Sequence, residues 1–137
     1  MEKEWKKIFI SPVKFHNDII KLAKMINNEK FNGVCGIPRG GSVVETYISH
    51  LCNLPVINLI TIHCYFKKYS DNVLIVDDII DTGKTLKDFS DYGYKIASVY
   101  YKPRSIIKPE YFTKQVKNSD WIIFPWESRN ELPNRNV

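Results

Sequence analysis

Three aspartates and a small polar turn stand together near the middle of the chain. Asp77 and Asp78 directly follow four apolar residues, 73–76, and Asp81 comes two isoleucines later. A polar turn completes the segment: Thr82, Gly83, Lys84 and Thr85. The apolar run is typical of a buried strand, and open α/β sheets bind their ligands at the carboxyl ends of such strands. The spacing therefore predicts a ligand site where this strand ends.

The residue types in this segment predict a sugar phosphate as the ligand. A helical pattern begins at the polar turn, so residues 81–85 present backbone amides at a helix start, and Gly83 permits an oxyanion to approach closely. Asp77 and Asp78 would repel a phosphate unless they face hydroxyl groups or share a divalent cation with it. A ribose 5′-phosphate meets both conditions, with hydroxyls and Mg²⁺ on the acid pair and phosphate on the turn.

Three other interpretations compete with this one. A phosphate-binding loop of the GxxxxGK[ST] type would need glycine where Asp78 stands. In a two-component receiver domain the acid pair would lie near the domain start, yet only about sixty residues follow Asp78, fewer than the ~100 of a typical domain. A solvated acidic turn would not require a third acid and the Thr-Gly-Lys-Thr sequence. We therefore favour the ligand site.

Residues 77–85, DDIIDTGKT, resemble the ribose-phosphate motif of type I phosphoribosyltransferases, which use phosphoribosyl pyrophosphate (PRPP). The resemblance implies an α/β fold with a parallel sheet flanked by helices, in a single domain over residues 1–137. It also implies a small hood built from residues 1–10 and 103–137. Mg²⁺ is the implied cofactor, held by Asp77 and Asp78, with Asp81 as general base.

A second glycine-rich turn follows the apolar residues 34–37. Arg39 stands there beside Gly40 and Gly41, so a guanidinium and open backbone amides can meet one polyanion. A plain strand–helix connection explains the glycines equally well. Beside the motif at 77–85, however, the turn resembles the family's pyrophosphate loop, which implies pyrophosphate binding by Arg39 and Gly40. Pro38 stands where the family often has serine.

Two later features resemble the purine-salvage branch of the family, and in particular its bacterial xanthine-guanine members. Lys102 and Pro103 end an apolar strand at 96–101, where the family's lysine contacts the exocyclic oxygen of the base. Residues 121–127, WIIFPWE, resemble the family's C-terminal tail. The implied base-binding residues are therefore Lys102, Trp121, Ile122 and Glu127. Taken alone, Lys102 is also compatible with a surface position, and a tryptophan such as Trp121 is more often a core residue than one that stacks on a ligand.

The remaining elements are predicted from periodicity and capping signals. Ser11 and Pro12 predict the start of a helix that runs to about residue 28. The other expected elements are strands at 8–10, 55–60 and 111–116, and helices at 42–52 and 86–92. Residues 61–72 stand where the family has a long mobile lid. Because this connection is short, we expect the protein to bind nucleotide tightly but to catalyse the reaction slowly.

Composition limits the class of protein. The chain has 137 residues, a net charge of +5 and three cysteines without CxxC spacing. The positive charge suits a polyanionic small molecule, and an odd cysteine count indicates a reducing compartment. No apolar run approaches membrane-spanning length. We expect a cytosolic protein with no membrane partner.

Together these features predict transfer of phosphoribosyl from PRPP to a 6-oxopurine, with release of pyrophosphate. The expected partners are PRPP and a purine, in a homodimer or homotetramer. The alternative is a non-catalytic or weakly catalytic PRPP- or nucleotide-sensing regulator on the same fold, one that could also bind nucleic acid. The short connection at 61–72 favours this alternative. Nucleic acid is not an expected partner of the main function, because no basic cluster is interleaved with aromatic residues.

Overall fold

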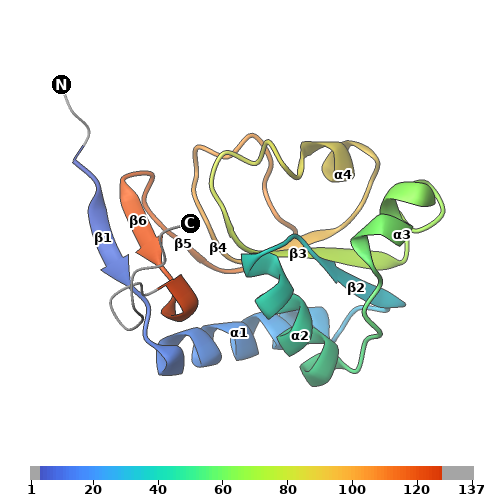
Figure 1. Ribbon diagram of the computed structural model, residues 1–137, viewed down its shortest axis with the longest axis horizontal. Helices are drawn as coiled ribbons and strands as arrows, with labels where there is room; N and C mark the ends of the chain where they lie inside the picture. Colours follow the sequence, from blue (N-terminus) through green and yellow to red (C-terminus); the bar gives the residue numbers. More distant parts are fainter. Residues whose placement is uncertain (1–3, 128–137) are drawn as a thin grey trace, which may run out of the picture.

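The computed structural model describes residues 4–127 and centres on a parallel four-stranded sheet in the order β2-β3-β4-β5 (Figure 1). The strands are Gly33–Gly36, Val73–Ile80, Ile96–Tyr101 and Tyr111–Gln115. A second parallel sheet pairs β1 (Lys6–Phe9) with β6 (Asp120–Ile123), which brings the two ends of the described chain side by side. The predicted α/β class with a parallel sheet is confirmed. Parts of the expected hood, residues 1–3 and 128–137, lie outside the described residues.

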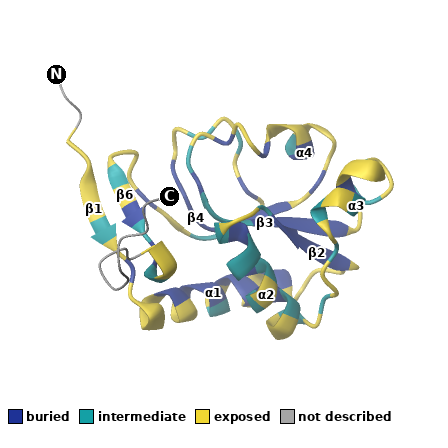
Figure 2. Cartoon of the chain, in the orientation of Figure 1, coloured by how far each residue is buried: buried dark blue, intermediate teal, exposed yellow. Residues whose placement is uncertain are grey.

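Helices cover both faces of the four-stranded sheet. Helices α1 (Pro12–Ile26) and α2 (Gly40–Cys52) pack on one face, while α3 (Leu59–Cys64) and α4 (Lys87–Asp91) contribute to the core on the other. Side chains along β3 alternate between these two cores, because successive residues of a strand point to opposite faces. Strands buried on both faces need continuous apolar sequence (Figure 2). Their burial explains the apolar runs that predicted β2, β3 and β4.

The first helix begins where its capping residues predict. The Ser11 side chain accepts a hydrogen bond from the Lys14 amide at 3.1 Å, and Pro12 occupies the first turn. Ile19, Leu22 and other apolar residues then face the sheet from one side of α1. No helix within residues 4–127 combines the length and apolar character needed to cross a membrane.

The prediction of a strand at residues 55–60 is wrong. Only Val56 forms a bridge, to Val34 of β2. The Asn58 side chain accepts a hydrogen bond from the Ile60 amide at 2.7 Å and begins α3. A capping asparagine competes with strand pairing, and here it ends the extended segment.

The central strand is longer than its apolar run predicts. Pairing with β4 continues to the end of β3, where Ile80 lies opposite Tyr101. Asp77 and Asp78 therefore lie within the strand and not in a loop after it. The polar turn also does not lead directly into a helix, because α4 begins only at Lys87.

The connection at 61–72 folds against the core on the α4 side of the sheet. Ile62 is fully buried, and the Phe66 ring packs 5.2 Å from that of Phe89 and 5.1 Å from that of Tyr94. The Tyr94 hydroxyl donates a hydrogen bond to the Phe66 carbonyl. These contacts fix the segment to the body of the domain.

A buried carboxylate ties α1 to the sheet. Asp18 accepts hydrogen bonds from the Tyr100 hydroxyl and from the Lys14 ammonium, the latter at 2.9 Å. Its side chain is almost completely buried, so the lost hydration of the carboxylate is replaced by these two donors. Removing one donor leaves a charge that is less well satisfied.

We predict that Tyr100→Phe lowers the free energy of unfolding by about 1–3 kcal/mol, because the buried Asp18 oxygen loses its hydroxyl donor. The matched control is Tyr101→Phe, which removes a hydroxyl bonded to Gln115, an exposed side chain. Urea unfolding of both variants measures the difference. Equal losses in the two variants would contradict a special role for Asp18.

Candidate functional site

The acid pair lies at the carboxyl end of β3, against the start of α2. The Asp78 amide donates to Asp77 Oδ1 at 2.9 Å, and the Ile79 amide donates to Asp78 Oδ1 at 2.8 Å. A Cβ on Gly40 would lie 1.9 Å from Asp78 Oδ2. A side chain at position 40 would therefore force the Asp78 carboxylate away from its place beside the helix start.

Burial raises the pKa of both acids. For Asp77 the lost hydration is the largest cause, and the neighbouring charge of Asp78 adds to it. For Asp78 burial again dominates, and the charge of Glu127 also raises its pKa. Two like charges in such a site favour retention of a proton by the pair. A cation or hydroxyl donors would replace that proton.

The acid pair suits a hard divalent cation. Mg²⁺ commonly takes one or two carboxylates and completes its shell with substrate phosphates and water. Asp77 and Asp78 supply two such carboxylates. Within residues 4–127 no group of three or more histidine, cysteine or acidic side chains is arranged to hold a metal ion.

The second glycine-rich turn, at residues 38–41, follows β2 and lies beside the acid pair. Arg39 is exposed and occupies the N-cap position of α2, after a cis peptide bond between Pro38 and Arg39. A Cβ on Gly41 would lie 2.9 Å from the carbonyl oxygen of Val76 in β3. The predicted pyrophosphate residues and the acids therefore lie on neighbouring strand ends.

The polar turn at 82–85 leaves most of its backbone amides without a hydrogen-bond acceptor among the described residues, although Gly83 itself is buried. Gly83 has a φ of +80°, a conformation that L side chains rarely adopt. The Lys84 amide donates to the Thr82 hydroxyl at 3.4 Å, and no described residue accepts a hydrogen bond from the amides of Thr82, Gly83 or Thr85. A Cβ on Gly83 would lie 2.5 Å from Ser105 Oγ. The glycine is therefore required by the neighbouring loop as well as by any phosphate.

A cavity of about 460 Å³ opens between the strand end and the two-stranded sheet. Its lining unites six of the predicted site residues from three separate parts of the sequence: Asp78, Asp81, Lys102, Trp121, Ile122 and Glu127. Asp77, Arg39, Gly40 and the turn at 82–85 do not line this cavity. The cavity has the size of a small-molecule site with a few convergent polar groups.

Lys102 lies deep in this cavity. It is only 4% exposed, and its ammonium is 3.6 Å from Asp81 Oδ1 and 4.7 Å from the centre of the Trp5 ring. Trp121, by contrast, is half exposed. Glu127 accepts a hydrogen bond from the Phe124 amide at 3.0 Å. The cavity therefore has a buried cationic donor, an exposed aromatic ring and an acid at its border.

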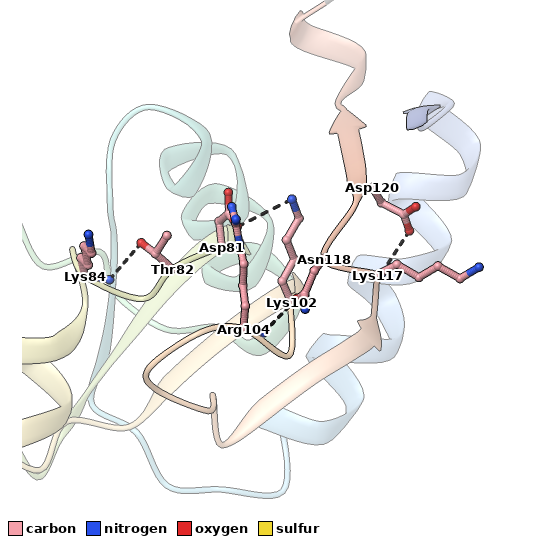
Figure 3. A network of polar contacts seen from close by, with 8 residues as sticks. All are labelled: Asp81, Thr82, Lys84, Lys102, Arg104, Lys117, Asn118 and Asp120. Atoms are coloured by element: carbon pink, nitrogen blue, oxygen red, sulfur yellow. Dashed lines mark hydrogen bonds and ion pairs between the residues drawn. The ribbon is translucent and has the colours of Figure 1, made fainter. Parts of the chain in front are cut away.

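Three residues of the site were not predicted from the sequence: Trp5, Ile79 and Arg104. Trp5 and Ile79 line the cavity, and Arg104 pairs with Asp81, as Figure 3 shows. Arg104 stands two residues after Lys102, which is a signal that could have identified it. Trp5 lies in a charged segment with no local pattern.

Comparisons with known proteins agree with the fold. No model of a known protein family matches the chain. The xanthine-guanine phosphoribosyltransferase of Desulfotalea psychrophila is 28% identical, over 96% of this chain and 94% of its own length. The protein of the same name from Idiomarina loihiensis is 25% identical, over 89% of this chain and 88% of its own.

The solved structure of a purine phosphoribosyltransferase from Pyrococcus horikoshii superposes with a TM-score of 0.72 and 26% identity. The match covers 96% of this chain and 99% of that one. The chain therefore has the fold of the type I phosphoribosyltransferases, which its motifs predicted.

The raised pKa of Asp77 predicts how stability changes with pH. The folded chain holds a proton that the unfolded chain releases near pH 4. Stability should therefore fall as pH rises above that range, towards the pKa of the folded pair. Asp77→Asn removes this titration, so the variant should be more stable at pH 8 by on the order of 1 kcal/mol.

Unfolding between pH 5 and pH 9, with a chelator present, measures this effect. The matched control is Asp71→Asn at an exposed position, which makes the same chemical change outside the acid pair. A wild-type stability that rises steadily over this range would contradict the raised pKa.

Proposed function

We propose that this chain, which has the type I phosphoribosyltransferase fold and is similar in sequence to xanthine-guanine phosphoribosyltransferases, transfers phosphoribosyl from PRPP to a 6-oxopurine. The purine is guanine, xanthine or hypoxanthine, and pyrophosphate is released. The observation that supports this most strongly is the cavity in which Lys102 and Trp121 meet Asp78 and Asp81. In this cavity the residues suited to a purine base, Lys102 and Trp121, lie beside the acids suited to a ribose.

The base would stack on Trp121, whose large apolar ring borders the cavity. Lys102 would donate a hydrogen bond to the exocyclic oxygen, because an ammonium group has donors and no acceptor. The backbone carbonyls of Trp121 and Ile122 would accept from a 2-amino group. Glu127 would lie at the border of the base site.

The phosphates would occupy the two glycine turns. The amides of residues 81–85 would hold the 5′-phosphate, because those of Thr82, Gly83 and Thr85 have no acceptor among the described residues. Arg39 and Gly40 would hold the pyrophosphate, where a guanidinium gives charge-assisted hydrogen bonds. Asp77 and Asp78 would hold the ribose hydroxyls and Mg²⁺. That ion, when bound, would neutralise charge on the leaving pyrophosphate.

The reaction forms a bond between a purine ring nitrogen and the anomeric carbon, and breaks the bond from that carbon to pyrophosphate. The electron pair of the broken bond leaves with pyrophosphate. Asp81 would accept the proton of the purine nitrogen as general base. The transition state has oxocarbenium character, so the protein contributes mainly by positioning the reactants and stabilising charge.

A second candidate function is a PRPP- or nucleotide-sensing regulator. The observation that favours it is the connection at 61–72, which packs on the body of the domain through Phe66 and Ile62. A sensor needs no segment that closes over the site to exclude water. In this case nucleotide binding would be tight and turnover slow.

We also propose that the β1–β6 sheet forms a hood over the base and that the protein is a cytosolic homodimer or homotetramer. The hood is supported by Trp121 and Ile122, which lie on β6 and line the cavity. The three free cysteines suit a reducing compartment.

The deciding experiment incubates the protein with PRPP, Mg²⁺ and one base at a time, followed by product analysis. Guanine, xanthine, hypoxanthine and adenine are the four bases. A nucleoside monophosphate from a 6-oxopurine, with release of pyrophosphate, supports the proposal. Tight nucleotide binding without any product would support the regulator instead.

We predict that Lys102→Gln lowers the preference for guanine over adenine by at least about tenfold, because a carboxamide can accept a hydrogen bond as well as donate one. The ratio of kcat/KM values measures this independently of how much protein is folded. The control is Lys95→Gln, at the opposite end of β4. An unchanged ratio would exclude Lys102 from base recognition.

A further inference from the structure

The residue proposed as general base is held from one side by two cations. The Arg104 Nε donates to Asp81 Oδ1 at 2.6 Å, and Arg104 Nη2 pairs with the same oxygen. The Lys102 ammonium lies 3.6 Å from that oxygen too. Asp81 Oδ2 has no hydrogen-bond or ion-pair partner among the described residues. One carboxylate oxygen is therefore anchored and the other is available to a ligand.

Arg104 is itself held in place from two directions. Its backbone amide donates to Asn118 Oδ1 at 2.9 Å, which links the loop after β4 to the turn before β6 (Figure 3). Its guanidinium carbon lies 5.5 Å from the centre of the Trp5 ring, and the same ring lies 4.7 Å from the Lys102 ammonium. Cation–π attraction thus keeps both cations on one side of Asp81.

The loop that contains Arg104 is also joined to the polar turn. The Ile106 amide donates to the Thr82 carbonyl at 2.8 Å, and Ser105 approaches Gly83. Arg104 therefore moves with the segment that follows Asp81. A planar guanidinium on such a loop restricts the orientation of a carboxylate more strongly than a flexible lysine does.

We propose that Arg104 is a positioning residue for Asp81, and that Trp5 and Asn118 fix its orientation. By anchoring Oδ1, Arg104 turns Oδ2 of Asp81 towards the purine nitrogen whose proton it accepts. This inference rests on the proposed transferase function. It assigns Arg104 no contact with either substrate.

A double-mutant cycle tests the assignment. Arg104→Gln should lower kcat by about ten- to a hundredfold, since general-base catalysis contributes about 10²–10⁴-fold and only its geometry is disturbed. The KM for PRPP should change by less than about threefold. In an Asp81→Asn background the same substitution should cost less than about twofold, because residues that act as a unit are not additive. An equal loss in both backgrounds would overturn the proposal.

A second measurement does not depend on residual activity of the Asp81 variant. Arg104→Ala should recover activity when millimolar guanidinium chloride is added, because the free cation can pair with Asp81. The same salt should not stimulate Lys108→Gln, which removes a charge from the same loop over the Phe112 ring. Failure of rescue, or a loss seen only as a higher KM for the base, would also overturn it.

The outcomes separate the two proposals. A wild-type protein that is inactive with all four bases refutes the transferase function. An active wild type whose Arg104→Gln variant is as fast as Lys108→Gln refutes only the role of Arg104. Arg104→Lys gives a further check, since it keeps the charge and loses the planar guanidinium; its kcat should lie between the wild-type and Arg104→Gln values.

Discussion

The partial burial of two adjacent carboxylates near the end of β3 is the constraint on which the rest of the site depends. Lost hydration is the main reason why the pKa values of Asp77 and Asp78 are raised. Holding these carboxylates here therefore lowers the stability of the folded chain. The first turn of α2 approaches them so closely that a side chain at Gly40 would overlap Asp78. The glycine turn and the start of α2 are therefore fitted closely to the acid pair. A site with two partly buried like charges is stabilised by a cation that neutralises them or by hydroxyl groups that donate hydrogen bonds to them.

The elements buried on both faces were the ones that the sequence predicted best. Continuous apolar runs located β2, β3 and β4, because a strand covered on both sides has no polar face to interrupt the pattern. Ser11 and Pro12 located the start of α1 through capping chemistry. The two failures have different causes: in one, tertiary pairing overrides local preference, and in the other a local helix cap was overlooked. Aspartate is rare in strands, so the part of β3 that includes Asp77 and Asp78 was missed. The segment at 55–60 has suitable residues, but it forms a single bridge before Asn58 turns it into α3.

The same distinction between local and long-range signals explains which site residues were predicted and which were missed. Residues inside contiguous motifs were predicted because their neighbours give each of them a context. Trp5 was missed because its role depends on contact with Lys102 and Arg104, about a hundred positions away in the sequence. That contact exists only when β1 pairs with β6 and brings the chain ends together. Parallel pairing of distant segments leaves no local signal in either one. Gly83 was predicted for a different reason from the one that the structure supplies, since its Cβ would meet Ser105.

The order of the strands arranges charge along the ligand edge. Arg39 follows β2, the acid pair lies in the last half of β3, and Lys102 and Arg104 follow β4, so cations flank a central pair of acids. A ligand matched to this order needs acceptors at both ends and hydroxyl groups in the middle. PRPP beside a 6-oxopurine has this order: pyrophosphate, then ribose hydroxyls, then the carbonyl oxygen of the base. A nucleic acid presents phosphates at regular spacing along its whole backbone, and the central acids would repel it. The alternation of charge across three neighbouring strands therefore favours a compact ribose phosphate and a base over an extended polyanion.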